Sequence, residues 1–80
     1  AARDEAFFAQ VVKLAFATRR KTLRNTLAVR ASALRLAAPE VLAALQTLDI
    51  DPGRRGETLS VAQFVTLSNE LLTRREKGDG

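Results

Sequence analysis

Apolar residues recur at helical spacing through this chain, and no stretch shows the strict alternation of apolar and polar residues that a half-buried strand requires. The first helical stretch, Glu5 to Thr18, has apolar side chains at positions i, i+3, i+4 and i+7, namely Phe8, Val11, Val12 and Ala15. The pattern predicts an all-α fold, a small bundle of about four helices. Residues 1–80 are expected to form one helical domain, because so short a chain supports a single core.

A second helix is predicted to begin after Thr22, a candidate N-cap, and to run to about Leu34. Its apolar side would hold Leu23, Leu27, Ala31 and Leu34. Pro39 suits the first position of a third helix, because a helix needs no N–H there. The buried stripe of that helix would be Val41, Leu42, Leu45 and Leu48.

Residues 49–56 read as the longest loop, since Asp, Pro and Gly favour turns. Ser60 and Gln63 then have the spacing of a capping box at the start of a fourth helix. That helix is predicted to end near Arg74 and Arg75, leaving residues 77–80 as a flexible tail. The four phenylalanines fall in helical stripes and are interpreted as core residues.

The chain contains no cysteine and no histidine, which removes thiolate nucleophiles, imidazole bases and ordinary zinc sites. Asp49 and Asp51 resemble the start of a calcium loop, but Ser60 stands where a bidentate Glu is required. There is also no glycine-rich phosphate loop. We therefore expect no catalytic residues, no metal site and no bound cofactor in this chain. No apolar run approaches the roughly 20 residues of a membrane span, so a soluble protein is expected. Its expected location is the cytoplasm.

Positive charge is concentrated in one part of the chain. Residues 13–35 hold seven Lys and Arg and no Asp or Glu, a charge of +7 within a net charge of +4. The richest part lies at a helix corner and predicts a set that binds a sugar–phosphate backbone, consisting of Arg19, Arg20, Lys21, Arg24 and Asn25. Guanidinium groups bind phosphate in a bidentate manner, and hydroxyl and amide groups add neutral hydrogen bonds. The alternative is a structural corner whose cations pair with Glu57, Glu70 or Asp49. Arg55 and Glu57 are expected to form a structural ion pair.

Two strings of residues form a specific pair in this chain. One is Phe16-Ala-Thr-Arg-Arg-Lys-Thr-Leu-Arg-Asn-Thr-Leu27. The other comprises Ile50-Asp-Pro, Arg55-Gly-Glu57-Thr-Leu59-Ser60 and Gln63-Phe64. Together they resemble the C-terminal helical domain of KsgA-type ribosomal RNA adenine dimethyltransferases, and the resemblance runs from about Phe7 to Leu72. It departs at Gly56, where that family more often has Ala or Pro, and this difference is expected to loosen the turn.

The resemblance implies a parent enzyme that transfers methyl groups from S-adenosylmethionine to two adjacent adenines near the 3′ end of small-subunit ribosomal RNA. In such enzymes an N-terminal Rossmann-like domain carries the cofactor and catalytic residues. This chain, whose start at Ala1 without a Met suits an excised piece, would then dock ribosomal RNA or the small subunit and pack on that domain. By motif position, the resemblance makes Arg19, Arg20, Lys21, Arg24 and Asn25 the candidate RNA-binding residues, or alternatively residues that contact the catalytic domain. Two alternatives remain, a purely structural helical domain without RNA contact and a small helix-turn-helix nucleic-acid-binding module.

Overall fold

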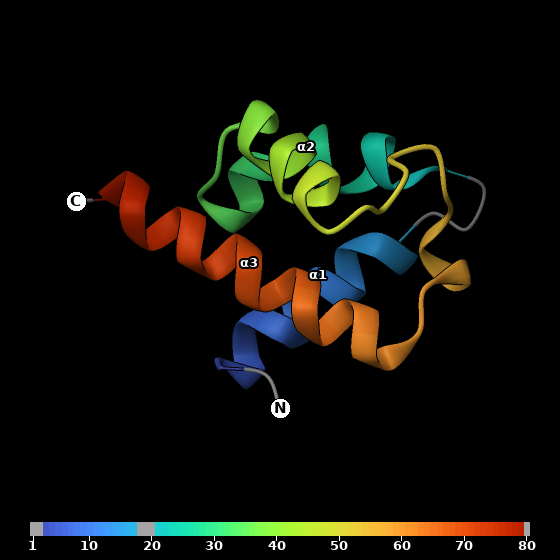
Figure 1. The fold of residues 1–80 in the computed structure, drawn as a ribbon, viewed down its shortest axis with the longest axis horizontal. Coiled ribbons are helices and arrows are strands. Elements are labelled where there is room, and N and C mark those ends of the chain that lie inside the picture. Colours follow the sequence, from blue (N-terminus) through green and yellow to red (C-terminus); the bar gives the residue numbers. More distant parts are fainter. Residues whose placement is uncertain (1–2, 18–20, 80) are drawn as a thin grey trace.

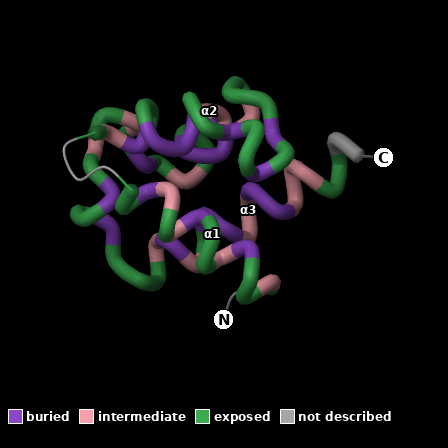
Figure 2. Tube along the Cα trace, turned by 180° about the vertical axis from the view of Figure 1, so that it is seen from behind, coloured by how far each residue is buried: buried purple, intermediate pink, exposed green. Residues whose placement is uncertain are grey.

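In a computed structural model, which describes residues 3–17 and 21–79, the chain is all-helical and its described residues form no strand. Three α-helices surround a shared core, and shorter helical turns connect them (Figure 1). Helix α3 packs against both α1 and α2, and α2 also packs against the short helix η1. The buried parts of the trace face one another across the interior (Figure 2). The predicted all-α fold is therefore confirmed.

Helix α1 spans Glu5–Phe16 and begins as its sequence predicts. The Asp4 carboxylate accepts a hydrogen bond from the backbone N–H of Phe7 at 3.0 Å, which satisfies one of the free donors of the first turn. Phe7, Val11 and Ala15 are buried at i, i+4 and i+8. The helix thus turns one stripe toward the core. It ends at Phe16, whose side chain is 42% exposed, so the interpretation of Phe16 as a core residue is wrong. The predicted end, Thr18, lies outside the described residues.

The predicted second α-helix is wrong as a single element, because residues 22–34 divide into two short helices. A π-helix, η1, spans Arg24–Ala28, and a 3₁₀-helix, η2, spans Ala31–Leu34. The buried Thr26 hydroxyl donates to the Thr22 carbonyl at 3.1 Å. The Thr26 backbone N–H donates to the same carbonyl, so a side chain and the helix backbone share one acceptor. The expected core residues are nevertheless all buried: Leu23, Leu27, Ala31 and Leu34.

Helix α2 spans Ala38–Thr47, with Pro39 at its second position rather than its first. The chain leaves α2 through Asp49, which has a left-handed φ of 58°. A 3₁₀-helix, η3, spans Gly56–Thr58. It packs on α1 and leads into the last helix.

Helix α3 spans Val61–Asp79 and opens with the predicted capping box. The Gln63 N–H donates to the Ser60 hydroxyl oxygen at 3.1 Å, and the Ser60 N–H donates to the Gln63 side-chain oxygen at 2.9 Å. The helix continues past its predicted end near Arg74 and Arg75. Contacts with the start of the chain hold these last turns: the Arg75 guanidinium lies 4.7 Å from the ring centroid of Phe7.

Candidate nucleic-acid interface

Two segments far apart in the sequence meet beside the end of α1. Thr22 and Arg55 form an isolated antiparallel bridge. Two backbone hydrogen bonds flank it, from Leu23 N–H to the Arg54 carbonyl at 2.7 Å and from Arg24 N–H to the Pro52 carbonyl at 2.9 Å. We call residues 21–24 and 52–55 together the basic junction. Their relative position is fixed by backbone pairing, so it does not depend on flexible side chains.

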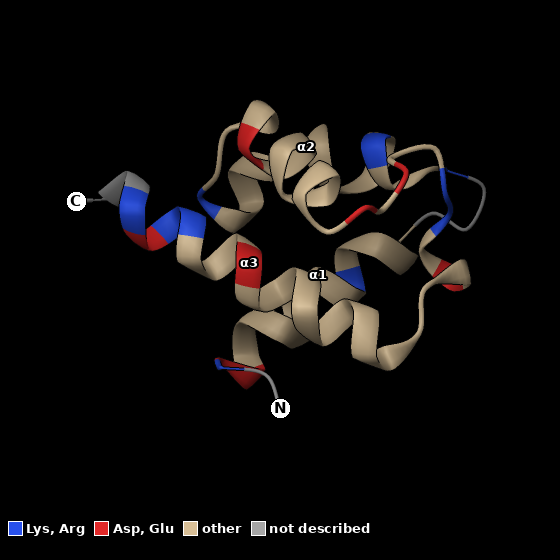
Figure 3. Cartoon of the chain, viewed as in Figure 1, with Lys and Arg blue, Asp and Glu red and all other residues tan. Residues whose placement is uncertain are grey.

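The basic junction gathers cations from both segments: Lys21, Arg24, Arg54 and Arg55. Three of these residues are exposed, and Arg54 is half-buried. Figure 3 shows Lys and Arg positions of both segments at one edge of the molecule. A group of exposed cations that adjoin one another attracts a polyanion more strongly than the same charges scattered over the surface.

The half-buried Arg54 is held by Thr58, which lies in η3. The Arg54 Nε donates to the Thr58 hydroxyl at 3.1 Å, and Nη2 donates to the Thr58 carbonyl at 2.6 Å. The Thr58 hydroxyl in turn donates to the Arg55 carbonyl at 2.6 Å. These bonds leave the charge of Arg54 uncompensated, because its partners are neutral, and they stabilise the chain around Arg55.

The ion pairs of the described residues lie away from the basic junction. They are Arg3 with Glu76 at 2.8 Å, Arg74 with Glu70 at 2.8 Å, and Arg74 with Glu40 at 3.6 Å. Glu70, one of the carboxylates proposed to neutralise the basic corner, is thus bound to Arg74 instead. Within residues 3–17 and 21–79, neither Lys21 nor Arg24 has a carboxylate within 4.0 Å. This favours a free phosphate-binding surface over a structural corner for these two residues.

Two neutral residues lie at the start of η1, namely Asn25 of the predicted set and Thr22, which precedes it in the sequence. The Thr22 hydroxyl accepts a long hydrogen bond, 3.4 Å, from the backbone N–H of Asn25, consistent with its predicted capping role. Asn25 itself is exposed. Arg19 and Arg20 lie outside the described residues, and the sequence places them directly before Lys21.

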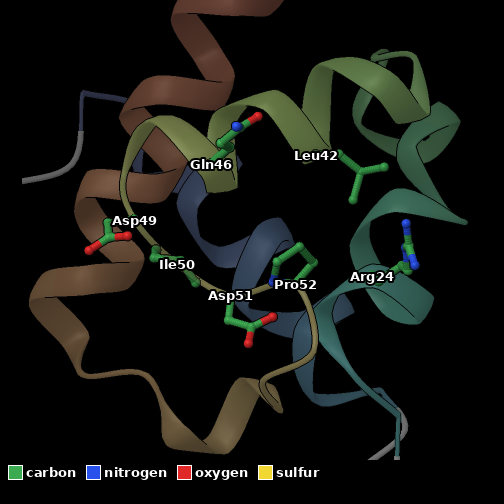
Figure 4. A pocket seen from close by; sticks show the side chains of 7 residues that line it. All are labelled: Arg24, Leu42, Gln46, Asp49, Ile50, Asp51 and Pro52. Carbon is green, nitrogen blue, oxygen red and sulfur yellow. The ribbon is translucent and has the colours of Figure 1, made fainter.

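A pocket of about 410 Å³ adjoins the basic junction on the side of α2. Its lining comes from η1, α2 and the loop that follows α2 (Figure 4): Arg24, Leu42, Gln46, Asp49, Ile50, Asp51 and Pro52. The Asp51 carboxylate caps the turn by accepting from the Gly53 N–H at 2.8 Å. Asp49 and Asp51 repel phosphate, so a phosphate at the basic junction is expected outside this pocket.

The chain is similar to one part of several bacterial enzymes. It is 47% identical over 68 residues to ribosomal RNA small subunit methyltransferase A of Geobacillus sp. (strain WCH70), covering 85% of this chain and 23% of the relative. The protein of the same name in Geobacillus thermodenitrificans is 46% identical over 72 residues, covering 90% of this chain and 25% of the relative. The chain is homologous to a segment of ribosomal RNA small subunit methyltransferase A. It spans about a quarter of the length of these relatives. No protein-family model matches it.

The expected Arg55–Glu57 ion pair is not among the ion pairs of the described residues. Both residues are exposed, and they lie on either side of Gly56 at the start of η3. Arg55 is instead fixed through its backbone, by the bridge to Thr22 and by the Thr58 hydroxyl. Its guanidinium group therefore adds to the charge of the basic junction.

Sequence reasoning missed that Arg54 and Arg55 adjoin the first basic cluster. No local pattern reports such a contact, because an antiparallel bridge joins residues that are distant in sequence. The one indication of this contact in the sequence was that the two strings that carry the family resemblance occur together. The first string contains Lys21 and the second contains Arg55.

In the part of the chain that the structure describes, no three acidic side chains come together as metal ligands. No helix there is both long enough and apolar enough to cross a bilayer.

Proposed function

We propose that this chain is the RNA-docking domain of a methyltransferase that acts on small-subunit ribosomal RNA. One observation carries the proposal: backbone pairing places Arg55 beside Lys21 and Arg24, and none of these three cations has a carboxylate partner among the described residues. Phosphate contacts position a nucleic acid without reading its sequence, and exposed Lys and Arg supply them. Arg19, Arg20 and Asn25 extend the proposed surface along the chain.

The reaction itself would take place in the rest of a longer protein. The relatives are about four times as long as the matched segment, and the resemblance assigns S-adenosylmethionine and the two adjacent adenines to an N-terminal Rossmann-like domain. Residues 1–80 would then be an accessory C-terminal domain in the cytoplasm, without a catalytic group or cofactor of their own. Its partners would be ribosomal RNA, within the small subunit, and that catalytic domain.

The alternative helix-turn-helix module is disfavoured by the local structure. Such a module reads bases with a regular recognition helix whose exposed side chains enter the major groove. In this chain the corresponding stretch is the π-helix η1 followed by the 3₁₀-helix η2. Thr26, Leu27 and Ala28 of η1 are buried. The segment is therefore better suited to contact the sugar–phosphate backbone of a nucleic acid than to read its bases.

A salt titration tests the proposal on the longer enzyme, with an RNA fragment from the 3′ end of small-subunit ribosomal RNA. The cluster variant replaces Arg19, Arg20, Lys21 and Arg24 with Ala. If these cations contact about four phosphates, the slope of log affinity against log salt should become less steep by about 3 to 4. An unchanged slope would contradict RNA contact and favour the purely structural domain.

A matched control removes a cation elsewhere on the domain. Arg35 belongs to the connection from η2 to α2, residues 35–37, and this connection lies on the opposite side of the molecule from the basic junction (Figure 1). Its left-handed φ of 59° is tolerated by Asn. Arg35→Asn should therefore leave both affinity and slope nearly unchanged, whereas Arg55→Ala should reduce the steepness of the slope by about 1.

A further inference from the structure

The pocket of about 410 Å³ beside the basic junction combines apolar walls with charged groups of both signs. Its volume lies within the range of roughly 300–1,000 Å³ that small-molecule sites occupy. The half-buried Leu42 and Pro52 and the buried Ile50 form its apolar walls. Figure 4 shows the Pro52 ring between the Asp51 carboxylate and the Arg24 guanidinium. A planar ring seated against Pro52 would therefore have an anion on one side and a cation on the other.

The charged groups of this pocket are not paired with each other. None of the ion pairs of the described residues includes Arg24, Asp49 or Asp51. Arg24 is also part of the basic junction, so a phosphate bound there would lie at the edge of the pocket. Separate charges of opposite sign favour a ligand with complementary groups, an anion at one end and hydrogen-bond donors at the other. A nucleotide whose base presents donors has this character.

The Asp51 carboxylate is oriented by the backbone and retains acceptor sites for a ligand. Its Oδ1 accepts from the Gly53 N–H at 2.8 Å, which ties the side chain to the turn. A carboxylate has about four acceptor sites on its two oxygens, so most of them remain. Guanine presents two adjacent donors on its Watson–Crick edge, N1–H and the N2 amino group, and a carboxylate accepts from both. The other RNA bases place an acceptor beside their donor, which a carboxylate repels.

We propose that this pocket binds an unpaired guanine base of the RNA whose phosphates lie at the basic junction. The inference rests on the proposed function, since it assumes that the junction holds RNA. Sequence-specific recognition of RNA acts mainly on unpaired bases, which are read through their hydrogen-bonding edges. Asp51 would accept from the base, and Arg24 would contact the neighbouring phosphate. The carboxylates that keep phosphate out of the pocket thus leave it to the base.

Short single-stranded RNAs test this on the longer enzyme. Two oligouridines of equal length carry either guanosine or inosine at the centre, and fluorescence anisotropy gives their dissociation constants at one salt concentration. Inosine lacks only the N2 amino group of guanosine, so the comparison removes a single pair of donors. Guanosine RNA should bind about fivefold more tightly or better, because a hydrogen bond to a charged group contributes at least this much. Equal affinities would overturn the proposal.

Asp51→Asn is the variant that tests the site. The Asn side-chain oxygen still accepts from the Gly53 N–H, but its amide turns donors toward the donors of guanine. The preference for guanosine over inosine should therefore disappear, and a preference that survives this substitution would overturn the proposal. Asp49→Asn is the matched control, because it makes the same chemical change and Asn tolerates the left-handed φ of 58°. The Asp49 side chain points away from Pro52 (Figure 4), so the preference should remain.

Photochemical crosslinking adds a measurement on the unaltered enzyme. With 6-thioguanosine at the centre of the same oligouridine, mass spectrometry should find crosslinks within residues 42–52. Crosslinks confined to other parts of the enzyme would overturn the proposal even if guanosine is preferred, because the preference would then belong to another site.

The guanosine–inosine comparison keeps the number of phosphates constant, so its outcome is independent of the salt titration. A salt slope reduced in the cluster variant, together with equal affinities for the two RNAs, would refute the base pocket and leave the phosphate contacts standing. An unchanged slope, together with a guanosine preference that Asp51→Asn removes, would refute the contacts at the basic junction and leave the base pocket standing.

Discussion

Gly56 lies so close to α1 that a Cβ atom at position 56 would be 2.9 Å from the carbonyl oxygen of Ala15. Gly56 has no positive φ, so space and not backbone conformation requires glycine there. The residue is buried, and it begins η3 directly after the basic junction. The expectation that glycine loosens this turn is therefore replaced by a close helix contact that glycine permits.

Gly56→Ala is accordingly predicted to destabilise the chain, although the related family often has Ala at this position. The added methyl would also lie 3.1 Å from the Ala15 side chain, so α1 and η3 must move apart. Overpacking of this kind costs about 1–3 kcal/mol in the free energy of unfolding, which urea denaturation measures.

Gly53→Ala is the matched control for that substitution. A Cβ atom at position 53 would approach the end of the Asp51 side chain at 3.2 Å, and that side chain is exposed and can give way. We expect a change below about 0.5 kcal/mol. Equal losses for the two alanine variants would show that the contact with Ala15 is not the cause.

The capping box at the start of α3 is predicted to stabilise the helix through two reciprocal hydrogen bonds. Ser60→Ala removes the acceptor of the Gln63 N–H and should lower the free energy of unfolding by about 1 kcal/mol. Gln63→Ala should give a smaller loss. A double-mutant cycle in urea measures their coupling, and additive losses would mean that the two bonds act separately.

The capping box and the helix junction show which features the sequence could predict. Caps and buried stripes depend on residues three or four apart, so Ser60 with Gln63 and the buried Leu23 and Leu27 were predicted correctly. The division of residues 22–34 into π and 3₁₀ turns could not be predicted, because both forms bury nearly the same side chains as an α-helix. The bridge from Thr22 to Arg55 is a long-range contact, and local periodicity contains no information about it.

Arg35 is predicted to reduce stability through its backbone conformation. It caps the end of η2 with a left-handed φ of 59°, where its N–H donates to the Ser32 carbonyl at 3.0 Å. A residue with a Cβ atom is disfavoured there by about 1–2 kcal/mol relative to glycine. Arg35→Gly should therefore raise the melting temperature, by about 4–8 °C for each kcal/mol gained in a domain of this size.

Arg30 provides the contrast for this prediction. It lies at the other end of η2 with a negative φ of −103°, where glycine relieves no strain. Arg30→Gly removes the same charge and should leave stability unchanged or lower it slightly, because glycine adds freedom to the unfolded chain. Equal gains from both variants would point to relief of charge repulsion in place of backbone strain.

The charges of Arg55 and Glu57 are predicted to act on RNA and not on each other. Both side chains are exposed, and the structure places no ion pair between them, so Arg55→Gln and Glu57→Gln should each change the free energy of unfolding by less than about 0.5 kcal/mol. A double-mutant cycle should give a coupling energy near zero, whereas an exposed ion pair gives about 0.2–1 kcal/mol.

In RNA binding the two substitutions should have opposite effects, because Arg55→Gln removes a cation beside Lys21 and Glu57→Gln removes a nearby anion. Weaker binding for the first and tighter binding for the second, with the difference shrinking at high salt, is the expected result. A coupling energy of 0.5 kcal/mol or more would restore the structural ion pair, and RNA affinity unchanged in both variants would remove Arg55 from the contact surface.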